Sequence, residues 1–423
     1  MKRLTISILV LISIFLATYF IFRTWRGLHL LGLSPSKENF LKTVRLIPSS
    51  SDPFYRMSLF HEWEMKNVDP KESLGFLREA IERNPFEQRY WLNLAQLLHL
   101  LEEKKGSEEA LEKAISVFPT GYRGRWTSGT LLLQQGSFEK AIPHFTYILS
   151  HYPNRSRLVY DIMRRATLDM DVLLERLVPK DPPSMHRYIA YLCEIGDLES
   201  AKRAWEKKVS YGFKSSREET VRYIEFLIGH GDVNAGFHVW KEALREEGFK
   251  IPSDGNLITN GGFEQEKLLG GGFDWKIRKV KGADVSFDPS VSFKGKSSLR
   301  IAFDGKENVN FHHVYQYVPL RAETDYLLKT CMKSEKITTR SGVKIEIIGI
   351  GGIGPRFYAA SESLTGDNDW KELTVAFRTP AGSQGGLVRV RREETSKLDR
   401  FIAGTVWIDD VELKENAKPP KDR

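Results

Sequence analysis

A recurring proline most restricts how this 423-residue chain can fold, because Pro85, Pro119 and Pro153 lie 34 residues apart. The residues five, eight and twelve positions before each proline are small or apolar in all three copies: Ala80, Ala114, Ile148, Leu77, Leu111, Phe145, Ser73, Ser107 and Ala141. A fixed period of this length indicates stacked helix pairs, since one pair cannot bury its apolar face alone. The proline ends the second helix of each pair because it lacks an amide hydrogen.

Two further copies begin 35 residues apart, at Gly196 and Gly231, with Trp205 and Trp240 in register. The stretch between the two groups, residues 155–178, is too short for a full copy, and we expect one irregular helix pair there. Apolar residues at helical spacing usually pack against neighbouring helices, so the repeat aromatics are interpreted as core. The pattern therefore predicts five or six helix pairs.

These residues resemble the tetratricopeptide repeat family. The second copy places Trp91, Leu94, Ala95 and Leu98 at the family's first-helix positions. The third copy fits most closely, through Gly129, Leu132, Gly136, Phe138, Ala141, Phe145, Ile148 and Pro153. The resemblance implies an all-α helical solenoid over residues 52–248 whose concave groove binds a protein partner.

The N-terminus predicts a membrane anchor. Residues 4–22 contain no charge and no proline, and 19 residues of helix span about 30 Å. A cleavable signal peptide would have a shorter apolar region and a small-x-small exit, whereas this stretch leads directly to Arg23. We expect an anchor over residues 1–26 and a linker over 27–51. The short N-terminal tail favours a single-pass protein of the bacterial inner membrane, with the bulk of the chain periplasmic or otherwise extracytoplasmic.

Composition narrows the class of partner. The net charge is +8 and the isoelectric point is near 9.1, but 63 basic residues alternate with 55 acidic ones along the chain. This mixture is typical of a solvated surface, and we expect no nucleic-acid partner. Cys193 and Cys331 fall in different predicted domains, so they form no disulfide framework.

The apolar period changes to two beyond residue 255. Alternating apolar positions such as Leu299, Ile301 and Phe303, separated by glycine-rich turns, predict eight or nine half-buried strands without intervening helices. Such a run is typical of an all-β sandwich. The expected boundaries are a linker at 249–255, the sandwich at 256–415 and a disordered tail at 416–423.

The same region resembles the family 4/9-type carbohydrate-binding modules. The resemblance rests on the segments 256–264, 295–301, 316–318, 370–373 and 406–411, together with Trp275 and Tyr326. It implies a galactose-binding-like jelly roll, with a structural calcium ion where the first and last strands meet. The positions that match the calcium carboxylates are Glu264 and Asp410, and hard oxygen ligands are what calcium requires. The alternative is that Glu264 accepts turn hydrogen bonds and Asp410 ends a strand.

A sugar site needs an aromatic platform and a few polar groups that fix hydroxyls. In the run 311–318, alternation places Phe311, His313, Tyr315 and Tyr317 on one strand face, and His312, Val314, Gln316 and Val318 on the other. The sequence leaves open which face is core. Phe357 and Tyr358, beside a glycine-rich loop, can also reach a ligand. Arg389 and Arg391 project together, which suits an acidic glycan. The alternative for every one of these residues is core packing or a solvated edge.

The predicted architecture is thus a transmembrane helix, a tetratricopeptide-like solenoid and a jelly-roll sandwich. No nucleophile with a base, cysteine-rich metal cluster or distinguished carboxylate pair appears in the sequence, so we expect no enzyme. We predict a membrane-anchored scaffold that binds a protein through its repeats and a polysaccharide through its sandwich, in cell-surface polysaccharide assembly or export. The alternatives are a scaffold that binds only proteins and, with less support, a glycan-active enzyme.

Overall fold

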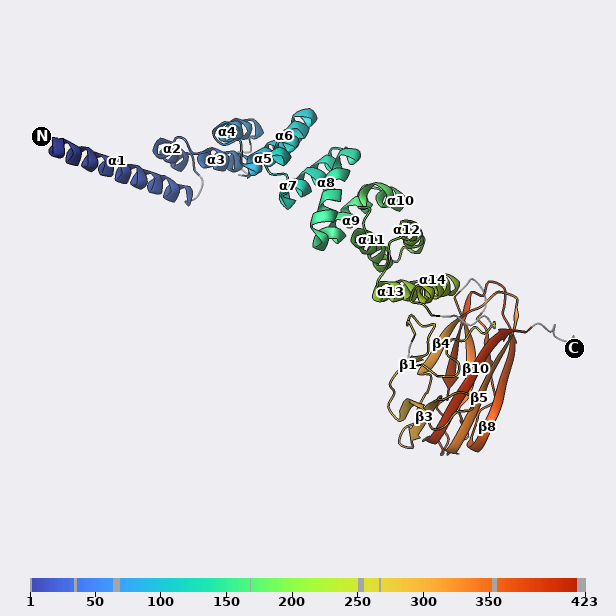
Figure 1. Cartoon of the computed structure of the whole chain (residues 1–423). Helices are drawn as coiled ribbons and strands as arrows, with labels where there is room; N and C mark the ends of the chain where they lie inside the picture. The colour runs from blue at the N-terminus through green and yellow to red at the C-terminus, as the bar shows by residue number, and fades with distance from the viewer. Residues whose placement is uncertain are drawn as a thin grey trace. The chain divides into compact units, whose positions relative to one another are not determined.

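The computed structural model describes residues 2–33, 36–63, 69–167, 169–249, 255–265, 268–351 and 356–416. The chain divides into two compact units, Met1–Tyr191 and Leu192–Arg423. Helices fill the N-terminal half, and two antiparallel sheets follow (Figure 1). The fold is therefore an N-terminal apolar helix, a helical solenoid and a β-sandwich, as the sequence predicts.

The helices alternate with short turns along the chain. Their bounds are α1 Lys2–Leu31, α2 Lys37–Leu46, α3 Asp52–Trp63, α4 Pro70–Arg83, α5 Gln88–Leu100, α6 Lys104–Val117, α7 Tyr122–Gln134, α8 Phe138–His151, α9 Ser156–Ala166, α10 Met170–Val172, α11 Pro182–Ile195, α12 Leu198–Ser210, α13 Arg217–Gly229 and α14 Val233–Glu246, with a 3-10 turn η1 at Pro153–Arg155 and a π-helical turn η2 at Leu173–Leu177.

The strands follow in the C-terminal part of the chain. Their bounds are β1 Lys276–Ile277, β2 Ala283–Asp288, β3 Ser298–Asp304, β4 Val314–Pro319, β5 Asp325–Ile337, β6 Lys344–Ile350, β7 Tyr358–Ala360, β8 Gly366–Arg378, β9 Gly385–Arg391 and β10 Ala403–Glu415.

Helix α1 is long and apolar enough over Ile6–Leu31 to cross a membrane, by length and composition. The segment 27–51, expected to be a linker, is largely helical, because α1 continues to Leu31 and α2 occupies much of the remainder. The α2 sequence is amphipathic: its Ser36 cap accepts the Asn39 amide hydrogen, and it buries Thr43. A short amphipathic helix therefore joins α1 to the solenoid.

The repeat period corresponds directly to helix ends and buried positions. Helices α4, α6 and α8 end at Arg83, Val117 and His151, each two residues before its proline. All nine residues at the recurring offsets are at most 2% exposed. Within the described residues, six helix pairs run from α3 to α14, and the pair at 155–178 is irregular, formed by α9 with α10 and η2. The predictions of five or six pairs and of one irregular pair are confirmed.

The sandwich consists of two five-stranded antiparallel sheets. Sheet A has the order β1-β4-β9-β6-β7, and sheet B has the order β2-β3-β10-β5-β8. Alternate residues of the two inner faces interdigitate in one core, which includes Val314, Val318, Ile345, Val388 and Ile408. The described residues contain ten strands, slightly more than predicted, because β1 and β7 are very short edge strands.

The last helix pair packs against the sandwich within the second unit. Trp240 of α14 is buried against Phe273, and its indole Nε1–H donates to the Gly270 carbonyl at 2.9 Å. On the sheet side, Gly385 of β9 lies so close to Val233 that a Cβ atom there would be 2.5 Å from the valine Cβ. Helices α12 to α14 and the sandwich therefore form one compact unit.

This grouping differs from the expected division at 249–255, where the sequence changes from helical to strand periodicity. Residues 250–254 and most of the expected tail, 417–423, lie outside the described residues.

Candidate functional site

Sheet A presents one face to the core and one face outward, and the strand register decides which residues lie on each. Val314, Gln316 and Val318 of β4 point into the core, so Tyr315 and Tyr317 lie on the outer face. Phe311 does not share that outer face, because β4 begins only at Val314. Its ring is fully buried, and its backbone forms an isolated bridge with Arg392.

Pairing between neighbouring strands brings three polar residues into one row. Tyr315 of β4 pairs with Arg389 of β9, and Arg389 pairs with Glu346 of β6. Ala360 of β7 pairs with Glu346, so Tyr358, two residues earlier, lies on the same face. Residues separated by tens of positions in the sequence therefore meet on the outer face of sheet A.

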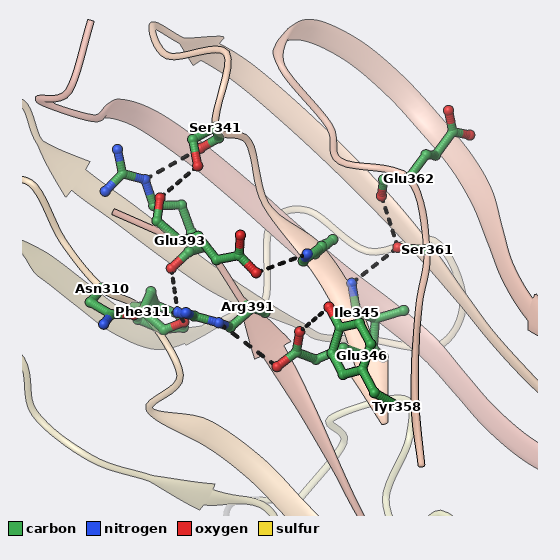
Figure 2. Close-up of polar contacts among 12 residues, drawn as sticks. Asn310, Phe311, Ser341, Ile345, Glu346, Tyr358, Ser361, Glu362, Arg391 and Glu393 are labelled. Atoms are coloured by element: carbon green, nitrogen blue, oxygen red, sulfur yellow. Dashed lines mark hydrogen bonds and ion pairs between the residues drawn. The ribbon is translucent and has the colours of Figure 1, made fainter. Parts of the chain in front are cut away.

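Glu346 is the centre of this row. Its side chain is 1% exposed, and it accepts hydrogen bonds from Arg389 Nε at 2.5 Å and Tyr358 Oη at 2.9 Å. Arg391 Nε lies 3.8 Å from the same carboxylate, which Figure 2 shows between Arg391 and Tyr358. The carboxylate holds both guanidinium groups and the phenol in fixed orientations. Sequence reasoning missed Glu346, whose only signal is an acidic residue in the apolar run 345–348.

A second network, of hydrogen bonds to residues 310, 311 and 392, fixes the orientation of Arg391. Its Nη1 donates to the carbonyls of Phe311 and Arg392 at 3.1 and 2.6 Å and also bonds Asn310 Oδ1 (Figure 2). The neighbouring Arg392 is fully buried and donates to four acceptors on three loops: Asn308 Oδ1 and the carbonyls of Val309, Ser341 and Arg400. One buried cation therefore ties together the loops that surround this end of the face.

Aromatic and basic side chains also lie beside Arg389 and Arg391 at this end of the outer face. The guanidinium of Arg278 lies 5.2 Å from the centre of the Tyr315 ring. The rings of His312 and His313 stack at 4.5 Å. Burial lowers the pKa of His312, and the nearby arginines Arg389, Arg391 and Arg278 lower it further. Burial and then His312 and Arg278 lower the pKa of His313.

Tyr317 and Phe357 have different surroundings. Tyr317 lies beneath the loop 268–275: a Cβ atom on Gly272 would be 2.5 Å from its ring, and the ring joins the apolar cluster around Trp240. Burial raises the pKa of Tyr317. Phe357 packs on the sandwich core and stacks on Phe377 with ring centres 5.3 Å apart. The structure therefore gathers five of the seven predicted sugar-site residues, and it places these two elsewhere.

We call the gathered residues the open end of the outer face, in contrast to the covered end around Tyr317. The open end comprises Arg278, His312, His313, Tyr315, Glu346, Tyr358, Arg389 and Arg391. The ring of Tyr358 is 56% exposed, whereas that of Tyr315 is 7% exposed under Arg278. Within the described residues, the terminal Nη groups of Arg389 and the guanidinium of Arg278 have no hydrogen-bond acceptor. The open end therefore offers aromatic surface and unused donors together.

The predicted calcium corner lies where residues 256–264 meet β10. Leu257 donates its amide hydrogen to the Leu413 carbonyl, and Val411 donates to Gly261. Asp410 adopts a left-handed backbone (φ 52°), and its carboxylate lies 2.5 Å from Lys294 Nζ. Asp409 is the fully buried carboxylate of this corner, and it accepts the amide hydrogens of Phe293 and Lys294.

These contacts fit calcium only in part. Glu264 Oε1 accepts the Lys296 amide hydrogen at 2.8 Å, so amide hydrogens and an ammonium group already face the three carboxylates. No group of three or more His, Cys, Asp or Glu side chains is arranged to hold a metal in the part of the chain that the structure describes. A Cβ atom on Gly262 would lie 3.7 Å from Asp409 Oδ1 and 4.0 Å from Glu264 Oε1, so these two carboxylates both lie beside Gly262.

No protein-family model matches the sequence, and a comparison with curated proteins gives no match. Several solved structures are similar in fold. A family 16 carbohydrate-binding module is 21% identical, with 37% of this chain and 99% of that chain covered and a TM-score of 0.26. A family 22 xylan-binding domain from Paenibacillus barcinonensis is 14% identical, with 37% and 91% covered and a TM-score of 0.27.

The helical part has a similar structure of its own. MamA is 21% identical, with 28% of this chain and 68% of that chain covered and a TM-score of 0.25. Scores this low carry no weight for function.

Proposed function

We propose that the open end of sheet A binds a polysaccharide. The observation that carries this proposal is the Glu346 cluster, in which one buried carboxylate orients two arginines and an exposed tyrosine ring on the same face. Sugar recognition needs an apolar ring surface beside donors that are fixed before the ligand arrives. Tyr358 supplies the exposed ring, and the terminal nitrogens of Arg389 and the guanidinium of Arg278 supply the donors.

The proposal includes a binding role and no catalytic one. Glycoside hydrolysis usually uses two carboxyl groups that flank the scissile bond. On this face Glu346 is buried beneath the arginines, and the nearby Glu393 accepts a hydrogen bond from Lys344 Nζ at 3.2 Å. Both carboxylates are therefore held by cations of the chain itself.

The rest of the chain supports a scaffold role for the protein. The solenoid offers stacked helix pairs, which commonly bind an extended or helical protein segment. Helix α1 has the length and apolar character of a membrane span. We propose that α1 anchors the protein in a bacterial inner membrane with the bulk outside the cytoplasm, where the repeats hold a protein partner during polysaccharide assembly or export. Alkaline phosphatase fused to the C-terminus tests the orientation, since it is active only outside the cytoplasm.

The experiment that tests glycan binding is an array of neutral and acidic polysaccharides probed with the full chain in detergent. The full chain is needed because the last helix pair packs on the sandwich. We expect saturable binding that Tyr358→Ala weakens at least tenfold, because the variant removes the exposed ring on which the sugar would stack. The variant should still fold, since an exposed side chain contributes little to stability. Trp370→Ala, on the other sheet, is the matched control and should bind normally.

A folded chain that binds no polysaccharide would contradict the proposal. The favoured function would then be the second candidate, a scaffold that binds only proteins. The apolar contact of α14 with the sandwich supports that candidate, because it shows that one end of this sheet face already packs against helices.

A structural calcium ion remains a separate proposal for the corner of residues 256–264 and β10. We assign it to Glu264 and Asp409 in place of Asp410, because Lys294 neutralises Asp410. Calcium takes six to eight oxygen ligands, so binding here would require backbone carbonyls and water as well. If the ion binds, calcium should raise the melting temperature of the wild type and not that of Asp409→Asn. Equal melting in calcium and in EDTA would refute it.

A further inference from the structure

The open end carries more positive than negative charge. It has three guanidinium groups, on Arg278, Arg389 and Arg391, and a single carboxylate, on Glu346. Arg278 lies over the ring of Tyr315, Tyr315 pairs with Arg389, and Arg389 and Arg391 share the Glu346 carboxylate, so the three arginines lie at the same end of the face. The excess at this end is two positive charges, and no other carboxylate of the described residues forms an ion pair with these arginines.

Two lysines near this face are already paired. Lys344 Nζ lies 3.2 Å from Glu393, and Lys276 Nζ lies 2.7 Å from Glu225 of α13. The unpaired charge is therefore concentrated between the Tyr315 ring and the Glu346 cluster. Charges on a partly buried face attract a ligand of opposite charge more strongly than charges on an open surface do, because water screens them less.

The guanidinium groups are also oriented for an anion. Glu346 engages Arg389 through Nε, and among the described residues no acceptor pairs with the two terminal nitrogens of Arg389, which form a pair of donors. A carboxylate accepts such a pair with two parallel hydrogen bonds, whereas a sugar hydroxyl accepts only one in good geometry. The Glu346 carboxylate is 1% exposed, so it does not contact a ligand, and its negative charge is already included in the net excess of two positive charges.

From this geometry we infer that the ligand of the open end is an acidic polysaccharide whose sugar carboxylates pair with Arg389, Arg391 and Arg278. The inference rests on the proposed glycan-binding function and names its ligand class. A neutral polysaccharide would leave the excess charge of the face unpaired and would gain only the stacking and single hydrogen bonds.

The test uses two probes with the same sugar backbone: polygalacturonate fragments, and the same fragments with their charged carboxylates converted to neutral methyl esters. Calorimetric titration of the full chain in detergent should give binding to the acid form at least tenfold tighter than to the ester. Raising the sodium chloride concentration from 50 to 500 mM should weaken the acid form alone, at least threefold, because salt screens charge pairs.

Three variants locate the contact. Arg389→Gln and Arg278→Gln should each weaken binding of the acid form at least tenfold. Arg278 is exposed and forms no ion pair with the residues that the structure describes, so its variant tests the ligand contact even if loss of Arg389 disturbs the Glu346 cluster. Arg300→Gln, which removes a positive charge from the outer face of sheet B, should bind as the wild type does.

The failures are distinguishable. Equal binding of acid and ester, or binding of neutral polysaccharides alone, would overturn the acidic ligand class and leave glycan binding in place. Binding of no polysaccharide of either kind by a folded chain would overturn both this inference and the proposed function.

Discussion

Tyr315 and Tyr317 lie two residues apart on the same strand and the same sheet face, with ring centres 5.9 Å apart, yet they lie in different environments. Tyr317 joins the apolar cluster beneath α14 and the loop 268–275, at the covered end. Tyr315 lies beside Arg278 and Arg389, at the open end. Both rings are covered, because Tyr315 is only 7% exposed under Arg278 and Tyr317 is partly buried by apolar groups. The comparison shows that strand alternation assigns an aromatic residue to a face, whereas distant segments decide what covers it.

The largest effect should follow from removing the main apolar contact of the covered end. Trp240→Ala deletes a side chain that is 1% exposed, and such deletions cost about 3–5 kcal/mol of unfolding free energy. If α14 stabilises the covered end, hydrogen exchange should accelerate in both α14 and β4. Faster exchange in α14 alone would show that the helix and the sheet are stabilised independently. Trp370→Ala, at a half-buried site on sheet B, should leave exchange in β4 unchanged.

A buried cation plays the corresponding role at the open end. Arg392→Met removes four hydrogen bonds from a fully buried guanidinium and leaves their acceptors unsatisfied, which we expect to cost about 3 kcal/mol. Exchange should accelerate in the loops around residues 308–311 and 338–342 and stay slow in α14. Arg400→Met, at an exposed arginine, provides the control and should change stability by less than about 0.5 kcal/mol. A similar loss from both variants would contradict the assigned role of Arg392.

A smaller change tests how closely the helices approach the sheet. The Cβ atom of Gly385→Ala would lie 2.5 Å from Val233 Cβ, and overpacking of this kind costs about 1–3 kcal/mol. We expect a lower melting temperature. Gly75→Ala, in the exposed interior of α4 with no atom within 4 Å of the added carbon, should instead gain about 0.5–1 kcal/mol. A harmless Gly385→Ala would mean that α14 and β9 are further apart in solution.

The smallest effect distinguishes the two ends by pH. The pKa values of His312 and His313 are lowered on folding, mainly by burial, so the folded state favours the neutral rings. The unfolded chain then binds more protons just below pH 6.5, and stability should fall as the pH decreases from that value. Exchange should accelerate at the open end before the covered end. Replacing both histidines with glutamine should reduce this pH dependence, and an unchanged dependence would assign it to other groups.

Most of the fold could be predicted from the sequence, because the 34-residue repeat and the two-residue alternation both identify which residues are buried. In the solenoid a 34-residue period has one structural meaning, so Ala80, Ala114 and Ile148 occupy equivalent buried positions. In the sandwich a period of two gives the strands, but it does not give their order. The pairing of Arg389 with Glu346 depends on β9 lying beside β6, which links residues 43 positions apart.

The candidate site was therefore predicted in part. Arg389, Arg391, Tyr315, Tyr358 and His313 were named because of their chemistry and alternation. Tyr317 and Phe357 share that chemistry, but packing against α14 and the core depends on contacts that no local pattern encodes. Likewise, the sequence named Asp410 as the carboxylate of the calcium corner, whereas Asp409 is the buried one and Asp410 adopts a left-handed backbone beside Lys294.

The junction of α1 with α2 has a mechanical consequence. Arg23 of α1 donates to the carbonyls of Arg45 and Leu46 at the end of α2, and Gly27 lies against Ile47. The ring of Phe40 in α2 in turn packs edge-on against Phe54 and Phe76 of the first helix pair. Helix α2 therefore contacts both α1 and the first helix pair, so a rotation of α1 about its own axis would also rotate the first repeat. Any membrane or partner that fixes the rotation of α1 therefore also fixes the direction in which the first repeat faces.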